Sequence, residues 1–93
     1  MDKDALEKMN EILEEVKNFV RDEPDRESLS YKIEEKSYQQ IYDKLSEFGF
    51  KVRETDNNVL RIKMDNLKFG KTPFSKKSEL FINDVPFIIR KKL

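Results

Sequence analysis

Basic side chains alternate with apolar ones along two neighbouring segments of this 93-residue chain. The segments are residues 50–54 (FKVRE) and 59–64 (VLRIKM). Successive side chains of a β-strand point to opposite faces, so a hairpin of these strands would bury its apolar residues and gather its cations on the other face. Those cations are Lys51, Arg53, Arg61 and Lys63. Like charges placed in this way repel one another weakly, and such a surface is suited to bind an anion, either a nucleic acid or an acidic protein surface.

The charge of the whole chain is unevenly distributed along the sequence. Residues 1–50 carry a net charge of −6 and residues 51–93 a net charge of +6, so the chain is neutral overall. Either the two halves attract each other and the basic face is ordinary solvated surface, or the second half faces an anionic partner. Lys76 and Lys77 are predicted to extend the basic patch. The basic residues 90–92 are weaker evidence for the same patch.

The chain lacks the residue types on which most catalytic and metal sites depend. It contains no His and no Cys, which excludes an imidazole base, a thiolate nucleophile and the usual zinc sites. Gly70-Lys71-Thr72 resembles the end of a phosphate-binding loop, but Asp65 stands where the first glycine of that loop is required. We therefore predict a protein that is not an enzyme and that has no cofactor and no metal site.

The first segment that would position these side chains is an amphipathic helix. Apolar residues recur at spacings of three and four from Leu6 to Val20, and Pro24 ends the pattern. Asp4 is predicted to cap this helix, with Glu7 as its capping-box partner. The apolar stripe is too short for a convincing coiled coil, so we predict that it packs on the core, and a monomer or a weak homodimer is expected.

A second helix is predicted over residues 37–48. Ser37 would cap it with Gln40 as capping-box partner, and Gly49 would follow its end in a left-handed conformation. Its solvent face holds more acidic than basic residues, which is the wrong sign for a helix that enters a DNA groove. We therefore favour a packing helix over the recognition helix of a winged helix. Three tyrosines are predicted to cover the core with their hydroxyls outward: Tyr31, Tyr38 and Tyr42.

The remaining segments are predicted to be strands. Residues 29–35 alternate with period two, which favours a strand over the short helix that a winged helix would need there. Residues 55–58 (TDNN) would form the turn that connects the two strands of the basic hairpin. Further strands are predicted at 67–69, 80–82 and 85–90, with Pro86 at an edge.

The fold class is therefore α+β, with one domain over residues 1–93. The expected order is α-β-α-β-β followed by a β-rich tail, with two helices on one face of a small mixed or antiparallel sheet. The topology of residues 65–93 stays open.

The stretch from residue 5 to residue 64 resembles short accessory proteins of phages and prophages. The resemblance rests on the order helix, strand, helix, and on the segments "LSEFGFKV" and "NVLRIKM", in which a glycine leads from the helix into the hairpin. It implies a stoichiometric inhibitor that binds a host protein or nucleoprotein complex in the host cytoplasm, as an anti-defence or host-takeover factor.

Two other functions remain open from the sequence. A nucleic-acid-binding protein would use the basic hairpin face, and an assembly subunit would leave the apolar stripe of the first helix exposed. The chain has no apolar run long enough to cross a bilayer, so we expect no membrane partner.

Overall fold

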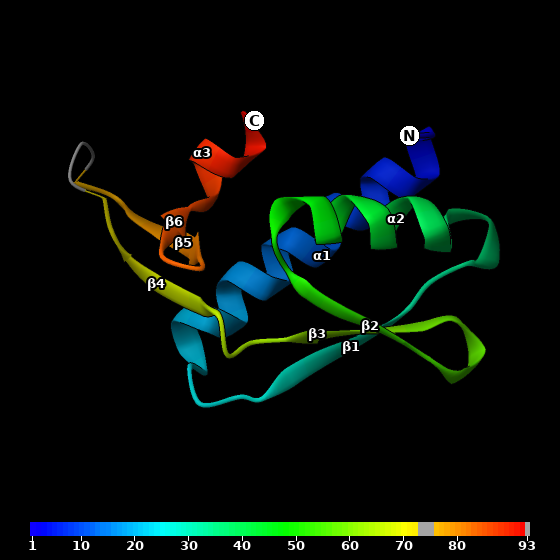
Figure 1. Cartoon of the computed structure of the whole chain (residues 1–93), viewed down its shortest axis with the longest axis horizontal. Coiled ribbons are helices and arrows are strands. Elements are labelled where there is room, and N and C mark those ends of the chain that lie inside the picture. The colour runs from blue at the N-terminus through cyan, green and yellow to red at the C-terminus, as the bar shows by residue number, and fades with distance from the viewer. Residues whose placement is uncertain (73–75, 93) are drawn as a thin grey trace.

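The computed structural model describes residues 1–72 and 76–92, and within them it has three α-helices and two small antiparallel sheets (Figure 1). The predicted α+β class is confirmed. The elements in chain order are α1 (Lys3–Asp22), β1 (Ser28–Lys32), α2 (Glu35–Phe48), β2 (Lys51–Thr55), the 3-10 turn η1 (Asp56–Asn58), β3 (Val59–Lys63), β4 (Leu67–Lys71), β5 (Ser78–Ile82), β6 (Val85–Pro86) and α3 (Phe87–Lys91).

The first sheet has the strand order β1-β3-β2, and both neighbouring pairs are antiparallel. Ile62 of β3 lies opposite Leu29 of β1 and Val52 of β2, so one row of apolar side chains crosses the sheet. In Figure 1, α1 and α2 both lie on one side of these strands, as predicted. α2 packs against β2, and α1 packs against α2 and β4. Strand β1 also excludes the short helix that a winged helix would need at this position.

The tail forms a sheet of its own, with the order β4-β5-β6, and does not complete the first one. The predicted strand over residues 85–90 is wrong beyond Pro86, because the chain turns there into α3. Proline has no N–H to continue a strand ladder. The turn also carries Phe87 into the core, where its ring centroid lies 5.2 Å from that of Phe48 and 5.9 Å from that of Phe50.

The predicted cap of the first helix is also wrong. Asp2 caps α1, and its Oδ1 accepts a hydrogen bond from the backbone N–H of Ala5 at 2.9 Å. Asp4 lies inside the first turn. The Gln40 amide explains why Asp2 caps the helix in place of Asp4. Its Nε2 donates to Asp2 Oδ2 at 2.8 Å, and its Oε1 accepts from the Asp2 N–H at 3.0 Å. These two hydrogen bonds join the start of α1 to α2.

The predicted capping box of α2 is wrong for a related reason. α2 begins at Glu35, and Ser37 lies within its first turn with only 3% of its surface exposed. Glu34 is the cap residue and makes no side-chain hydrogen bond to the helix. Gln40, the expected partner of Ser37, is engaged by Asp2.

Two turns follow the sequence prediction closely. Gly49 ends α2 with φ at +102°, and the Phe50 N–H then donates to the Leu45 carbonyl at 3.1 Å. Asn57 and Asn58 both have φ near +60° in the turn between β2 and β3. Asparagine tolerates this conformation better than most residues, so the turn fixes the hairpin that carries the basic residues.

Tyr31 departs from the predicted outward orientation of the tyrosine hydroxyls. Its hydroxyl is buried and has no hydrogen-bond partner among the residues that the structure describes. Burial, reinforced by the nearby Glu15, raises the pKa of Tyr31 to about 12. The hydroxyl therefore stays protonated in the fold, at a cost in stability, because a buried polar group without a partner has lost its hydration.

We expect Tyr31→Phe to raise the free energy of unfolding by roughly 1 kcal/mol at pH 8. The gain should grow as the pH rises from about 10 toward about 12, because only the unfolded wild-type chain ionises this phenol in that window. Urea unfolding at pH 8 and pH 11 measures both effects. Tyr42→Phe, at a partly exposed tyrosine of α2, is the control and should change little. A loss of stability in Tyr31→Phe at pH 8 would contradict the prediction.

Candidate binding surface

The solvent face of the first sheet gathers the basic residues of the hairpin. Arg53 lies directly opposite Arg61, and Lys51 lies directly opposite Lys63. All four side chains are exposed. Lys32, at the end of β1, is exposed as well and has the same strand phase. We call these five residues the cationic face: Lys32, Lys51, Arg53, Arg61 and Lys63.

The apolar residues between these cations hold the face in register. Leu60 and Ile62 are completely buried, and Val52 packs at the margin of the same core. A slip of one residue would turn every side chain of a strand to the opposite face, so burial of these residues specifies the position of the cations. The apolar residues of the alternating pattern therefore determine, by their burial, on which face the basic residues lie.

Lys32 was missed by the sequence prediction. It belongs to β1, and β1 reaches the hairpin only through its pairing with β3, in which Lys32 lies opposite Val59. Period-two alternation in residues 28–32 indicates a strand, but the alternation does not indicate with which other strand this one pairs. Without the pairing of β1 with β3, Lys32 could not be assigned to the cationic face.

One carboxylate neutralises part of the cationic face. Lys51 Nζ lies 3.0 Å from Asp65 Oδ2, and this hydrogen bond, with the Lys51 and Lys63 charges, lowers the pKa of Asp65. Within the described part of the chain, the other four cations of the face have no carboxylate oxygen within 4.0 Å. Most of the positive charge is therefore available to a partner.

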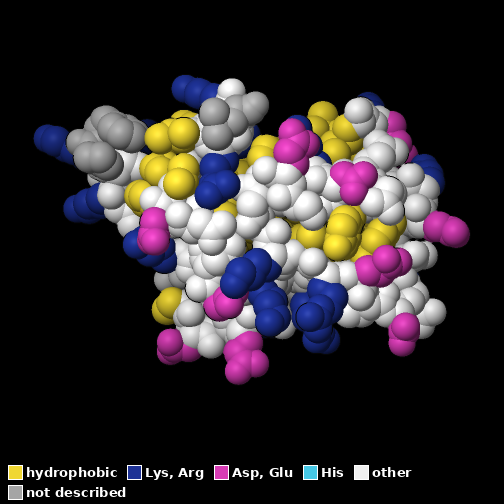
Figure 2. All heavy atoms as spheres, viewed as in Figure 1, with side chains coloured by type: hydrophobic (Ala, Val, Ile, Leu, Met, Phe, Trp, Pro, Cys, Tyr) yellow, Lys and Arg dark blue, Asp and Glu magenta, His cyan; other side chains and the backbone are white. Residues whose placement is uncertain are grey.

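The other side chains of this face are uncharged, and three of the four carry a hydroxyl. By strand phase they are Ser28, Ser30, Thr55 and Val59. β1, β2 and β3 are described completely, and none of them presents an aromatic ring on this side on which a base could stack. Figure 2 shows Lys and Arg side chains gathered on the side of the strands away from α2. The face can bind through charge and hydrogen bonds, and its chemistry suits carboxylates or phosphates.

Lys76 and Lys77 are not part of this surface. Both are exposed, but they immediately precede β5, which belongs to the second sheet. Figure 1 places that end of the second sheet far from the turn between β2 and β3. The predicted patch is therefore divided between two sheets.

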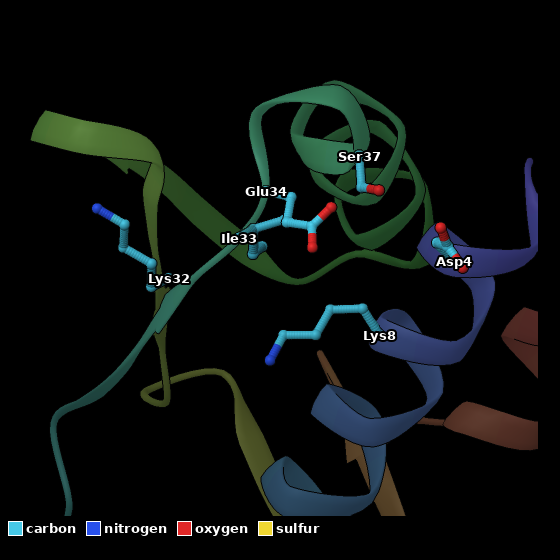
Figure 3. Close-up of a pocket in the computed structure, with 6 residues that line it drawn as sticks. All are labelled: Asp4, Lys8, Lys32, Ile33, Glu34 and Ser37. Atoms are coloured by element: carbon cyan, nitrogen blue, oxygen red, sulfur yellow. The ribbon is translucent and has the colours of Figure 1, made fainter.

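A cavity of about 290 Å³ opens between α1, the end of β1 and the start of α2. Figure 3 shows the Glu34 and Lys8 side chains on opposite sides of it, and Lys8 Nζ lies 3.8 Å from Glu11 Oε1. Asp4 and Glu34 also contact Lys36 Nζ, at 3.0 Å and 3.7 Å. Its charged lining residues are two lysines and two carboxylates, so this cavity is less suited to an anion than the cationic face. Among the residues that the structure describes, no three acidic side chains cluster to hold a metal ion.

Comparison with protein-family models, with curated proteins and with solved structures finds no match to this chain. The helices of the described residues include none that is both long enough and apolar enough to cross a bilayer.

Proposed function

We propose that this chain is a small, non-enzymatic binding protein that docks its cationic face on an acidic surface of a protein partner. The observation that carries the proposal is the exposed pair Arg53 and Arg61, which lie directly opposite each other on neighbouring strands. Like charges in this position destabilise a sheet. An arginine fork binds a carboxylate through two parallel hydrogen bonds, so an acidic partner would relieve this repulsion and gain directed contacts.

The charge of the rest of the molecule favours a local acidic patch over a long polyanion. The chain is neutral overall, and residues 1–50 carry a net charge of −6. Strands of five residues span roughly 17 Å, so the cationic face covers only a small area. A nucleic acid would extend beyond this area, whereas a partner protein can place a few carboxylates within it.

Nucleic-acid binding is the second candidate, and one observation favours it. Four cations of the face have no carboxylate partner among the described residues, and phosphates are as well matched to arginine as carboxylates are. This candidate predicts an affinity that falls steeply with added salt.

The resemblance to short phage accessory proteins supports a host protein or nucleoprotein complex as the partner. The chain would then act stoichiometrically in the host cytoplasm, by covering the acidic surface that it binds. Such an inhibitor needs no catalytic group, in keeping with a sequence that has neither His nor Cys.

The test compares the wild type with Arg53→Glu/Arg61→Glu in capture experiments from host lysate at physiological salt. The control is Lys3→Glu/Lys17→Glu, which makes the same change in charge on α1. A stoichiometric protein that the control retains and the arginine variant loses supports the proposal. No partner, or one that both variants retain equally, would overturn it. Fluorescence anisotropy with labelled duplex DNA, single-stranded DNA and RNA tests the second candidate, which requires binding that persists at physiological salt.

We expect Asp65→Asn to strengthen binding to an acidic probe about fivefold at low salt. The substitution frees Lys51 from its only described carboxylate contact, and a unit charge at about 4 Å contributes on the order of 1 kcal/mol in water. Anisotropy of fluorescein-labelled polyglutamate measures the change. Asp84→Asn is the matched control, because Asp84 pairs with Lys68 at 2.7 Å on the second sheet. Equal gains in both variants would mean that binding depends on net charge and not on the cationic face.

A further inference from the structure

The second sheet and α3 form an end of the molecule that exposes apolar side chains. Ile88 is 50% exposed and Ile89 is 37% exposed, on the first turn of α3. Phe81 and Pro86 lie opposite each other on β5 and β6, and both are partly exposed. In the view of Figure 2, hydrophobic side chains form a patch at the end where α3, β5 and β6 lie in Figure 1.

These apolar side chains share one side of the second sheet. Phe81 lies between Leu80 and Ile82, which are both completely buried, so alternation turns Phe81 to the outer face. Glu79 has the same strand phase as Phe81, and its Oε1 accepts a hydrogen bond from the Ile88 N–H at 2.8 Å. The first turn of α3 is therefore held beside the outer face of β5.

Lysines surround this apolar surface. Residues 67–92 contain seven basic and two acidic residues, which gives this part of the chain a net charge of +5. Lys68 pairs with Asp84. Four other exposed lysines have no carboxylate within 4.0 Å among the described residues: Lys71, Lys76, Lys91 and Lys92. Figure 2 shows Lys and Arg side chains around the edge of the apolar patch.

We propose that this end of the molecule, which we call the lysine-rich end, docks on the surface of an anionic phospholipid bilayer. Its cations are of a different type from those of the cationic face. Six of its seven basic residues are lysines, and the arginine, Arg90, donates from Nε to the Ile82 carbonyl at 3.1 Å. A lysine ammonium is a compact point charge without the fork that selects single carboxylates, so it suits the diffuse charge of a lipid surface. Exposed isoleucine and phenylalanine side chains can enter the boundary between headgroups and acyl chains.

Adsorption of this kind needs no membrane-spanning segment. The sequence predicted no membrane partner because its apolar runs are short, and the apolar side chains of the lysine-rich end come together only through the pairing of β5 with β6 and the turn into α3. The proposal uses no residue of the cationic face and is independent of the function proposed above.

The test is co-sedimentation of the purified protein with phosphatidylcholine vesicles that contain either no anionic lipid or about one third phosphatidylglycerol. We expect binding to the anionic vesicles only, weaker at physiological than at low salt. Ile88→Ser/Ile89→Ser and Lys91→Glu/Lys92→Glu should each lower the partition coefficient at least about tenfold. Lys3→Glu/Lys17→Glu, with the same change in charge on α1, should leave it within about twofold.

Three results would overturn the proposal. They are the absence of binding to anionic vesicles at low salt, an equal loss in the α1 control, and binding that is insensitive to both variants of the lysine-rich end. A different outcome would identify an acidic protein as the partner of this end. In that case the wild type binds labelled polyglutamate but not vesicles, and Lys91→Glu/Lys92→Glu loses the polyglutamate binding. The replaced side chains are exposed, and circular dichroism establishes that each variant is folded.

Discussion

Replacing Arg61 with glutamate is expected to stabilise the fold while it weakens the binding of an acidic partner. Arg61 is on the central strand β3, directly opposite Arg53 of β2 and Ser30 of β1. The substitution turns a repulsive cross-strand pair into an attractive one, and such pairs differ by about 0.2–1 kcal/mol. The free energy of unfolding should rise by that amount because the side chain is exposed and no core contact is lost.

Binding should change in the opposite direction. A carboxylate in the centre of the cationic face repels an acidic partner and removes one arginine fork, so we expect the affinity for labelled polyglutamate to fall about 10- to 100-fold. Urea unfolding and anisotropy on the same protein preparation measure both quantities. Arg61→Gln removes the repulsion without creating an ion pair, so it should give intermediate values of both. A variant that loses stability, or that binds as tightly as the wild type, would refute the role assigned to this pair.

Gly49→Ala is expected to have the largest effect on stability of the changes considered for this chain, a loss of about 2–4 kcal/mol. Gly49 has φ at +102°, a conformation that costs an L-residue on the order of 1–2 kcal/mol. An added Cβ would also lie 2.8 Å from Arg90 Nη1 and 3.2 Å from Ile82 Cγ2. Arg90 cannot withdraw without giving up its hydrogen bond to the Ile82 carbonyl.

Gly70→Ala is the matched control for this prediction. A Cβ at Gly70 would meet the Phe81 ring at 3.7 Å, which is an ordinary contact, and Gly70 does not have positive φ. We expect a change between zero and a gain of about 1 kcal/mol, because alanine restricts the unfolded chain. Thermal unfolding should show a midpoint lowered by more than about 10 °C for Gly49→Ala alone. Similar midpoints for the two variants would mean that the left-handed turn is not needed.

The features that the sequence predicted are those that neighbouring residues determine. Period-two alternation located β2 and β3, and the two asparagines before Val59 located the turn between them. The end of α2 at Gly49 follows from a single residue type. Four members of the cationic face were therefore predicted together, because their placement requires only one hairpin.

The features that the sequence did not predict depend on contacts between distant segments. Asp2 became the cap of α1 through Gln40, which is 38 residues away. Lys32 joined the cationic face through the pairing of β1 with β3, and Asp65 reached Lys51 from the turn after β3. The chain turns into α3 after Pro86, where Phe87 fills the core beside Phe48 and Phe50. Local patterns carry no information about such partners.

β2 is an edge strand of the first sheet, and this position affects the tendency of the chain to aggregate. In the order β1-β3-β2, one flank of β2 has no neighbouring strand among the described residues, so its backbone groups can pair with a strand of another molecule. Lys51, Arg53 and Glu54 project from this strand, and charged side chains discourage such intermolecular pairing. Arg53, which the proposed function places against the partner, thus also disfavours aggregation. A chain stripped of these charges would be expected to lose its partner and to form fibrous or amorphous aggregates.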